Sequence, residues 1–428
     1  MKPERQGRKK LHISAAHRAK MERDREEAEG KRCGQKMNAD LRQGKPARRV
    51  PEQWRRKCDG QRYLVVNKAV SDVGIDRHQQ RNCQAAKGKV SESFTGHLLI
   101  LTTEDCQKVT MHAPNTPMNR RIIPAEAVES MWQAADGWAI RRIDWQGANP
   151  ARGSLLFLPG RGDHYEKYLE TLAYYADAGW RVTAIDWRGQ GESGRLLADR
   201  EVGHIDDFAT WIADLRMFWS KWKHENPGPH VVMAHSMGGH LAMRALVEKA
   251  IDPDAVVMSA PMLGIQTGGL PLGLNHAFAK LMVKLGKGED AAWKVSEKPL
   301  SPMSMRGKML THDDGRYEDE IAWWELRPNV KLGPPSWHWV ERAIASIRML
   351  DAPGLLEAVK TPVLLLATTG DQLVSTPRVI IDSKRLPHAE TLIFGKEAAH
   401  ELLREADPVR DQCLARINSF LDAHAPRP

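Results

Sequence analysis

From about residue 122 onward, short apolar segments alternate with stretches whose apolar residues recur at helical spacing. Segment 131–145 alternates apolar and polar residues around Asp136-Gly137, which predicts an antiparallel hairpin. The later segments are continuous apolar runs, which are typical of strands buried on both faces. These predicted strands are SLLFLP (154–159), WRVTAIDW (180–187), HVVMAHS (230–236), DAVVMSAP (254–261), TPVLLLATTGD (361–371) and TLIFG (391–395).

The segments between these strands predict helices at 165–178, 205–222 and 237–250, and helical sequence also follows the last two strands. Strands that alternate with helices predict an α/β fold, with a mainly parallel sheet covered by helices on both faces. The opening hairpin would add antiparallel strands at one edge, for eight strands in all.

Charge is distributed unevenly along the 428 residues, whose formal net charge is +9. Residues 1–110 contain 26 Lys and Arg against 14 Asp and Glu, whereas the remainder contains 37 against 40. The first segment also has four of the five cysteines but only one of the 14 tryptophans. The basic excess therefore belongs to the first quarter of the chain.

Residues 1–110 have too few large apolar side chains to predict a packed domain, so we expect a basic, disordered extension. A second interpretation is an over-extended reading frame, with translation starting at Met111 or Met118. A nucleic-acid-binding arm is disfavoured because the segment lacks interleaved aromatic residues, a helix-turn-helix pattern and zinc-ligand spacing.

Several classes of protein are disfavoured by composition. No segment approaches the about 18 consecutive apolar residues of a membrane span. The basic N-terminus has no apolar segment behind it, which argues against a secretory signal. Five cysteines without a CxxC pair argue against a disulfide framework or zinc ribbon. We expect a cytoplasmic protein. We also expect it to contact the inner face of the membrane peripherally.

The segment Ala234-His235-Ser236-Met237-Gly238-Gly239 stands between a predicted buried strand and a helix. A serine between small residues at such a turn predicts a nucleophile elbow, because bulk two positions away would collide with the neighbouring strand and helix. The start of the helix also favours a developing negative charge at Ser236.

A serine nucleophile needs a base, and the base needs an acid that orients it. In this architecture the chain order is Ser, then Asp or Glu, then His. Asp371 follows the VLLLATTG strand, and His400 lies in the loop after the last strand. We therefore predict Ser236, Asp371 and His400 as a catalytic triad.

Acyl transfer also requires hydrogen-bond donors for the oxyanion. One predicted donor is the backbone N–H of Met237, directly after the nucleophile. The second is the N–H of Arg161 in the Gly-rich loop that follows the strand at 154–159, because Pro159 has no N–H to donate. A dinucleotide fingerprint is excluded because this loop lacks GxGxxG spacing. No metal or organic cofactor is expected.

Residues 122–425 resemble the α/β-hydrolase superfamily, and more narrowly its monoacylglycerol lipase and bacterial lysophospholipase branch. The motifs that carry the resemblance are LPGRGDHYEKY (158–168), AIDWRGQGESG (184–194), AHSMGGH (234–240), SAPMLGI (259–265), LTHDDGRY (310–317), TTGDQLV (368–374) and AAHELLRE (398–405). The oxyanion loop in that branch usually opens with His-Gly, where this chain has Pro159-Gly160. The resemblance implies the same triad and the same oxyanion donors.

Residues 262–345 separate two predicted core strands and are expected to form a lid inserted between core segments 122–261 and 346–425. Tryptophans in this insertion indicate an apolar acyl pocket, a surface that touches lipid, or the lid's own small core. The candidates for substrate contact are Trp323, Trp324 and Trp337.

These features predict a serine ester hydrolase whose substrate is a small acyl ester, a lysophospholipid or a monoacylglycerol. A serine aminopeptidase on the same scaffold is the alternative enzyme, and a non-catalytic binding protein is the alternative from another class. Epoxide hydrolase and dehalogenase chemistry is disfavoured because it needs an aspartate at the elbow, where Ser236 stands.

Overall fold

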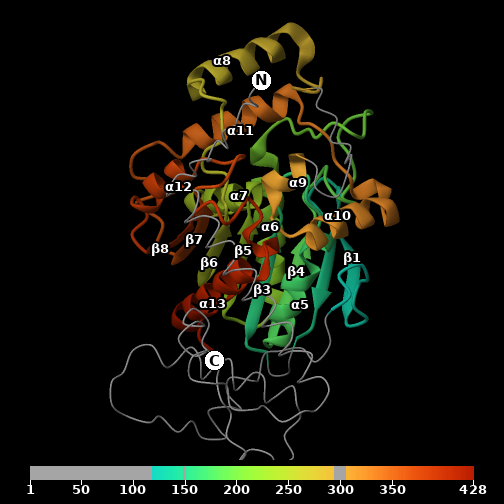
Figure 1. Ribbon diagram of the computed structural model, residues 1–428, viewed down its shortest axis with the longest axis vertical. Coiled ribbons are helices and arrows are strands. Elements are labelled where there is room, and N and C mark those ends of the chain that lie inside the picture. The colour runs from blue at the N-terminus through green and yellow to red at the C-terminus, as the bar shows by residue number, and fades with distance from the viewer. Residues whose placement is uncertain (1–117, 148–150, 294–304) are drawn as a thin grey trace, which may run out of the picture. The chain divides into compact units, whose positions relative to one another are not determined.

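The computed structural model describes residues 118–147, 151–293 and 305–428 (Figure 1). The expectations for residues 1–110 lie outside these described residues. Among the residues described, no helix has both the length and the apolar character needed to cross a membrane.

Eight strands form one sheet in the order β1-β2-β4-β3-β5-β6-β7-β8. β1 pairs antiparallel with β2, and β2 pairs antiparallel with β4, whereas all other pairings are parallel. This arrangement confirms the predicted α/β class and the hairpin at one edge. The strands are β1 (Ala127–Gln133), β2 (Ala139–Trp145), β3 (Gly153–Leu158), β4 (Trp180–Ile185), β5 (His230–His235), β6 (Ala255–Ser259), β7 (Val363–Thr368) and β8 (Ala389–Phe394).

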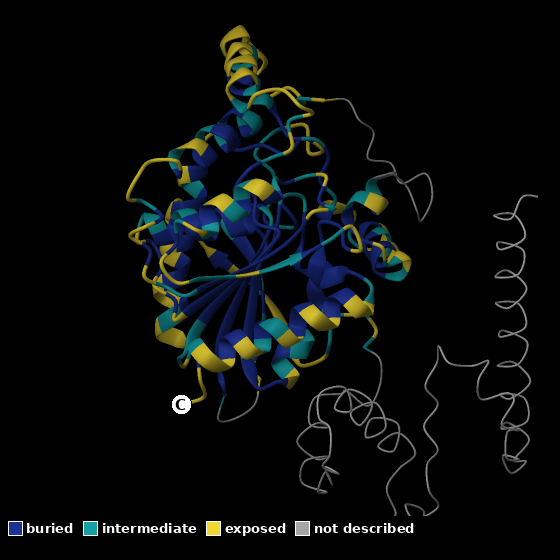
Figure 2. Cartoon of the chain, turned by 60° about the vertical axis from the view of Figure 1, so that its left-hand side comes forward, coloured by how far each residue is buried: buried dark blue, intermediate teal, exposed yellow. Residues whose placement is uncertain are grey.

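Helices cover both faces of the sheet, so the central strands are buried (Figure 2). Every residue of β3, β6 and β7 is buried, which explains their continuous apolar sequences. One face packs on α6, α7, α11 and α12, and the other packs on α5 and α13. These helices are α5 (Leu169–Asp177), α6 (Phe208–Glu225), α7 (Met237–Val247), α11 (Trp337–Met349), α12 (Thr376–Ser383) and α13 (Asp407–His424).

The residues described between β6 and β7 include four α-helices, α8, α9, α10 and α11. The expected end of the insertion at residue 345 falls inside α11, which continues to Met349 and packs Ala343 and Ile347 into the core. α8 lies against α11 at one end of the described structure, where His276 Nε2 is 3.0 Å from Glu341 Oε1 (Figure 1). Besides α11, the elements described between β6 and β7 are α8 (Leu272–Met282), η3 (Val283–Lys287), α9 (Met305–Leu310), α10 (Asp314–Leu326) and η4 (Pro328–Val330).

Candidate active site

Ser236 occupies a sharp turn between β5 and α7. Its backbone has φ 49° and ψ −115°, a left-handed φ that a residue with a side chain rarely adopts. Three hydrogen bonds hold this conformation. The Ser236 N–H donates to the Ser259 carbonyl at 3.0 Å, and the Ser236 carbonyl accepts from His240 N at 3.1 Å and Met262 N at 2.9 Å.

The small residues of the predicted elbow are required by close packing. A Cβ on Gly238 would lie 2.3 Å from the Leu158 carbonyl oxygen and 2.5 Å from that of Pro159. A Cβ on Gly239 would lie 2.8 Å from Pro261 Cβ. Any side chain at Gly238 would therefore push α7 away from the end of β3.

The structure brings the three predicted triad residues together. His400 Nδ1 lies 2.7 Å from Asp371 Oδ2, and His400 Nε2 lies 2.9 Å from Ser236 Oγ. A carboxylate can only accept, so Nδ1 carries the proton and Nε2 accepts from the serine hydroxyl in the neutral state. The other oxygen of Asp371 accepts from Leu373 N at 2.8 Å and Val374 N at 2.9 Å, which fixes the carboxylate in place.

The electrostatics of the pair suit a base that gains a proton during reaction. Burial disfavours the charge on Asp371, but His400 and two backbone N–H groups together hold its pKa below the usual value. Burial likewise disfavours protonation of His400, yet the Asp371 carboxylate outweighs this effect and raises the His400 pKa. The arrangement therefore stabilises an imidazolium at position 400.

A second histidine, His235, lies beside the triad. Its ring centroid is 4.8 Å from that of His400, and the side chain is buried. Burial, together with the neighbouring His400, lowers the pKa of His235 to about 4. His235 is therefore neutral at neutral pH and adds no positive charge next to His400.

The predicted oxyanion loop lies directly against the nucleophile. A Cβ on Gly160 would be 3.1 Å from Ser236 Cβ. The Gly160 N–H donates to Asp163 Oδ2 at 2.9 Å, and the Gly162 N–H donates to Gln190 Oε1 at 2.6 Å. These bonds fix the loop on both sides of Arg161. The backbone N–H groups of Arg161 and Met237 remain the predicted hydrogen-bond donors to the oxyanion.

A buried ionic cluster behind the site was not anticipated from the sequence. Lys167 Nζ lies 2.5 Å from Asp163 Oδ1, 2.7 Å from Glu401 Oε1 and 3.3 Å from Glu320 Oε1. Arg404 also pairs with Glu401. Burial opposes the charge of Glu401, but Arg404 and Lys167 lower its pKa to about 2. The cluster joins the oxyanion loop, the insertion and the residue that follows His400.

The insertion also contacts the loop of the catalytic histidine through its backbone. The His400 N–H donates to the Met309 carbonyl at 3.3 Å, and the Glu401 N–H donates to the Leu310 carbonyl at 2.7 Å. The backbone of α9 therefore helps to hold the loop of His400 in position.

The tryptophans predicted to contact substrate have packing partners of their own. Trp323 is buried and lies under the Arg327 guanidinium at 5.6 Å, and Trp324 is buried under Arg306 at 5.1 Å. Trp337 meets Phe278 edge-on at 5.3 Å. Substrate contact by these three tryptophans stays a prediction. Trp339 of the insertion reaches the oxyanion loop, with the Arg161 guanidinium 5.4 Å from its ring.

The eight-stranded sheet and the serine at the turn after β5 define an α/β-hydrolase. Within that class, the chain belongs to the family described as serine aminopeptidase, S33, whose model matches residues 149–407. It is a serine hydrolase of the monoacylglycerol lipase and lysophospholipase branch, as its motifs predicted.

The chain is similar to curated lysophospholipases. It is 29% identical over 282 residues to lysophospholipase L2 of Escherichia coli strain K12, covering 63% of this chain and 80% of that protein. It is 24% identical to the probable lysophospholipase L2 of Haemophilus influenzae, covering 65% and 87%.

Solved structures share the fold at lower identity. A soluble variant of monoglyceride lipase from Saccharomyces cerevisiae has a TM-score of 0.55 at 18% identity, with 73% of this chain and 100% of that chain covered. A carboxyl esterase from Bacillus coagulans has a TM-score of 0.53 at 16% identity, with 70% and 99% covered.

Proposed function

We propose that this chain hydrolyses fatty-acyl esters, with lysophospholipids or monoacylglycerols as substrates, through an acyl-enzyme on Ser236. The observation that carries the proposal is the chain of hydrogen bonds from Ser236 through His400 to Asp371, at 2.9 Å and 2.7 Å. The similarity to lysophospholipase L2 supports the substrate class.

In the acylation half, His400 Nε2 takes the proton from Ser236 Oγ as the oxygen attacks the ester carbonyl carbon. The carbonyl oxygen becomes an oxyanion, which the N–H groups of Met237 and Arg161 stabilise. Asp371 holds the imidazole in the required tautomer and stabilises its positive charge. When the carbon–oxygen bond breaks, His400 returns the proton to the leaving alkoxide, and the alcohol departs.

In the deacylation half, a water molecule replaces the alcohol. His400 takes a proton from this water, whose oxygen attacks the acyl-enzyme, and the same two N–H groups stabilise the second oxyanion. Collapse of this intermediate releases the fatty acid, and His400 returns the proton to Ser236 Oγ. No net charge or proton is left on the enzyme.

Replacing the nucleophile tests the mechanism. We expect Ser236→Ala to abolish hydrolysis of p-nitrophenyl fatty-acyl esters and labelling by a fluorophosphonate probe, while the circular dichroism spectrum is retained. Ser383→Ala is the matched control, because its hydroxyl donates to the Ile380 carbonyl near the end of α12. Undiminished turnover in Ser236→Ala would contradict the mechanism, and an unlabelled wild-type protein would favour a non-catalytic binding protein.

An aminopeptidase is the alternative, in keeping with the description of the family. Such an enzyme needs an anionic group to bind the substrate α-amine. The buried carboxylates of Asp163 and Glu401 lie nearby, but each pairs with Lys167, and Glu401 also pairs with Arg404. This pairing favours the ester substrate. Comparing a lysophospholipid with aminoacyl-nitroanilides separates the two activities.

The insertion offers a surface suited to the lipids that contain such substrates. Exposed apolar side chains follow one another at helical spacing from just before α8 through α8 and η3, and Figure 2 shows this helix, at the top, largely exposed. No Asp or Glu occurs between residues 262 and 288, whereas three exposed lysines do. These residues are Leu270, Leu274, Phe278, Leu281 and Leu285, with Lys280, Lys284 and Lys287.

We propose that this face lies on an anionic membrane surface and that the insertion serves as the lid. Sedimentation with vesicles of phosphatidylglycerol and phosphatidylcholine tests the contact. We expect Leu274→Ser/Phe278→Ser to lose vesicle binding, while Ile381→Ser, which alters an equally exposed apolar residue on α12, retains it. Equal binding by both variants would contradict the proposed surface.

A further inference from the structure

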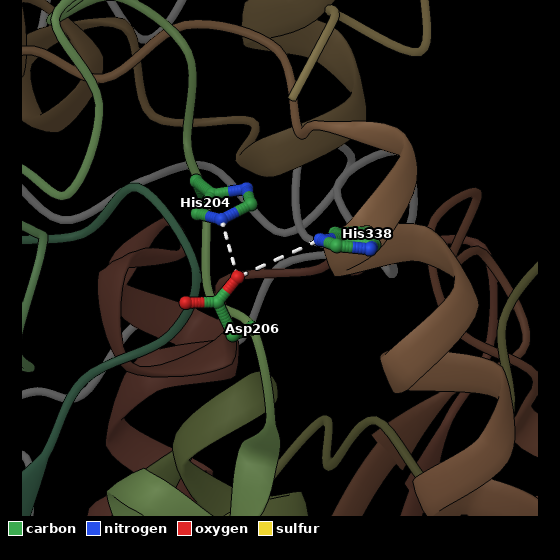
Figure 3. A group of neighbouring side chains, drawn as sticks. All are labelled: His204, Asp206 and His338. Carbon is green, nitrogen blue, oxygen red and sulfur yellow. Dashed lines mark hydrogen bonds and ion pairs between the residues drawn. The ribbon is translucent and has the colours of Figure 1, made fainter. Parts of the chain in front are cut away.

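Outside the triad, two histidines and one aspartate converge where the insertion meets the loop before α6. His204 and Asp206 belong to that loop, and His338 belongs to the first turn of α11 (Figure 3). One nitrogen or oxygen of each lies within 4.8 Å of the others. His204 Nε2 is 3.1 Å from Asp206 Oδ1, and His338 Nδ1 is 3.6 Å from the same oxygen.

The two separations from Asp206 Oδ1, 3.1 Å and 3.6 Å, match those between neighbouring ligands of a small divalent ion. Zinc takes imidazole nitrogen and carboxylate oxygen in tetrahedral geometry with bonds of about 2.0–2.2 Å, which places ligand atoms about 3.4 Å apart. A set of two imidazoles and one carboxylate suits zinc-class ions better than Mg²⁺ or Ca²⁺, which prefer oxygen ligands. Asp206 is largely exposed, so water can reach the fourth coordination position.

The surroundings of the two histidines are those of metal ligands. Ser336 Oγ lies 2.8 Å from His204 Nδ1 and can accept its proton, which leaves Nε2 with a lone pair facing Asp206. His338 Nδ1 is buried and has no hydrogen-bond partner within the part of the chain that the structure describes. A buried polar atom without a partner is costly, and metal coordination removes that cost.

We propose that His204, Asp206 and His338 bind one zinc-class divalent ion that ties the loop before α6 to the first turn of α11. The N–H groups at the start of α11 disfavour a nearby cation, and the Asp206 carboxylate supplies the opposing charge. The ion reinforces a junction that the backbone already makes, because Gly203 N donates to Pro334 O at 2.8 Å and Ser336 N donates to Gly203 O at 2.8 Å.

The ion has a structural role in this proposal and is separate from ester hydrolysis. α11 carries Trp339, which lies against Arg161 of the oxyanion loop. Fixing the first turn of α11 would therefore steady the insertion over the catalytic site. A metal site was not expected from the sequence, because His338 lies far along the chain from His204 and Asp206 and the three residues match no recognisable ligand spacing.

Zn²⁺ binding by the tag-free full-length chain, stripped with EDTA, tests the site by isothermal titration calorimetry. His338→Gln and Asp206→Asn each remove one ligand, and His224→Gln is the matched control because it alters an exposed histidine of α6. We expect one Zn²⁺ site in the wild type and in His224→Gln, weakened about 100-fold or lost in the two ligand variants. Comparing Zn²⁺ binding by the wild type and by its variants separates this site from Zn²⁺ binding at other cysteines and histidines, which the proteins share.

Thermal unfolding gives an independent readout. Zn²⁺ should raise the unfolding temperature of the wild type and His224→Gln but not that of the ligand variants, and Mg²⁺ should raise none. Identical Zn²⁺ stoichiometry and affinity in all four proteins would overturn the site. The absence of Zn²⁺ binding by the wild type would also overturn it.

Discussion

At Ser236 the backbone and the side chain are held by different partners. Hydrogen bonds to Ser259 and Met262 fix the left-handed backbone, and His400 orients the hydroxyl. Ser236 was predicted as the nucleophile from local sequence, because the elbow needs small neighbours between a buried strand and a helix. Asp371 and His400 were predicted from strand ends and chain order, and the structure places His400 Nδ1 2.7 Å from Asp371 Oδ2.

The orienting acid can be tested alone. We expect Asp371→Asn to lower kcat for a fatty-acyl ester by about 10³–10⁴-fold, because an amide does not favour the required tautomer or stabilise the imidazolium. Steady-state kinetics measure the change. Asp199→Asn, on an exposed turn, is the matched control and should retain wild-type kcat. A loss below tenfold in Asp371→Asn would argue against its assigned role.

The raised pKa of His400 predicts the pH dependence. His400 must be neutral to act as a base, so kcat/KM should fall on the acid side with a midpoint above the ordinary value of 6.5. Since the folded-state pKa is raised, the His400–Asp371 ion pair contributes stability that is fully present below about pH 6.5 and is lost as the pH rises through the folded value. A midpoint below 6.5 in the pH profile would contradict this electrostatic account.

At the scale of elements, the junction of β3, β5 and α7 sets the position of the nucleophile relative to the oxyanion loop. Contact between Gly238 and the end of β3 brings the loop against Ser236. A sequence motif can indicate that two backbone segments approach closely. The distance between them follows only from the three-dimensional structure.

Two glycines give a matched comparison. We expect Gly238→Ala to destabilise the protein by about 1–3 kcal/mol and to reduce activity strongly, because the new methyl would overlap the Leu158 carbonyl. Gly273→Ala in α8 meets nothing within 4 Å and should stabilise by about 0.4–1 kcal/mol. Urea unfolding measures both changes. Equal stability of the two variants would contradict the packing argument.

Strand positions were predicted well because continuous apolar runs have few other interpretations in a chain of this composition. The C-terminal limit of the insertion was harder to predict. The helix α11 crosses residue 345 and packs its apolar face into the core through Ala343 and Ile347. A helix that belongs to both parts leaves no change of pattern at the boundary. The first turn expected at 165 is a 3-10 helix over Tyr165–Tyr168 that precedes α5.

At the scale of the whole molecule, buried charges connect segments that are distant in sequence. Lys167, Glu320 and Glu401 come from the segment after the oxyanion loop, the insertion and the loop of His400. Each residue lay within or near a recognised motif, but charged residues are common, and their pairing depends on the tertiary fold. No sequence pattern therefore predicts such a cluster.

Neutralising one member of the cluster tests its contribution. We expect Glu401→Gln to destabilise the protein by about 3–5 kcal/mol, because Lys167 and Arg404 would remain buried with less opposing charge. Guanidinium unfolding measures the loss. Glu357→Gln removes an exposed pair with Arg385 and should leave the midpoint almost unchanged. Equal midpoints for the two variants would show that the cluster adds little.

The central claim is a covalent fatty-acyl intermediate on Ser236. Rapid quenching during turnover of a lysophospholipid, followed by proteolysis and mass spectrometry, tests it most directly. We expect one fatty-acyl group on the peptide that contains Ser236, formed and lost at rates consistent with kcat. Turnover of the lysophospholipid with no acyl adduct, or with the adduct on another residue, would contradict it.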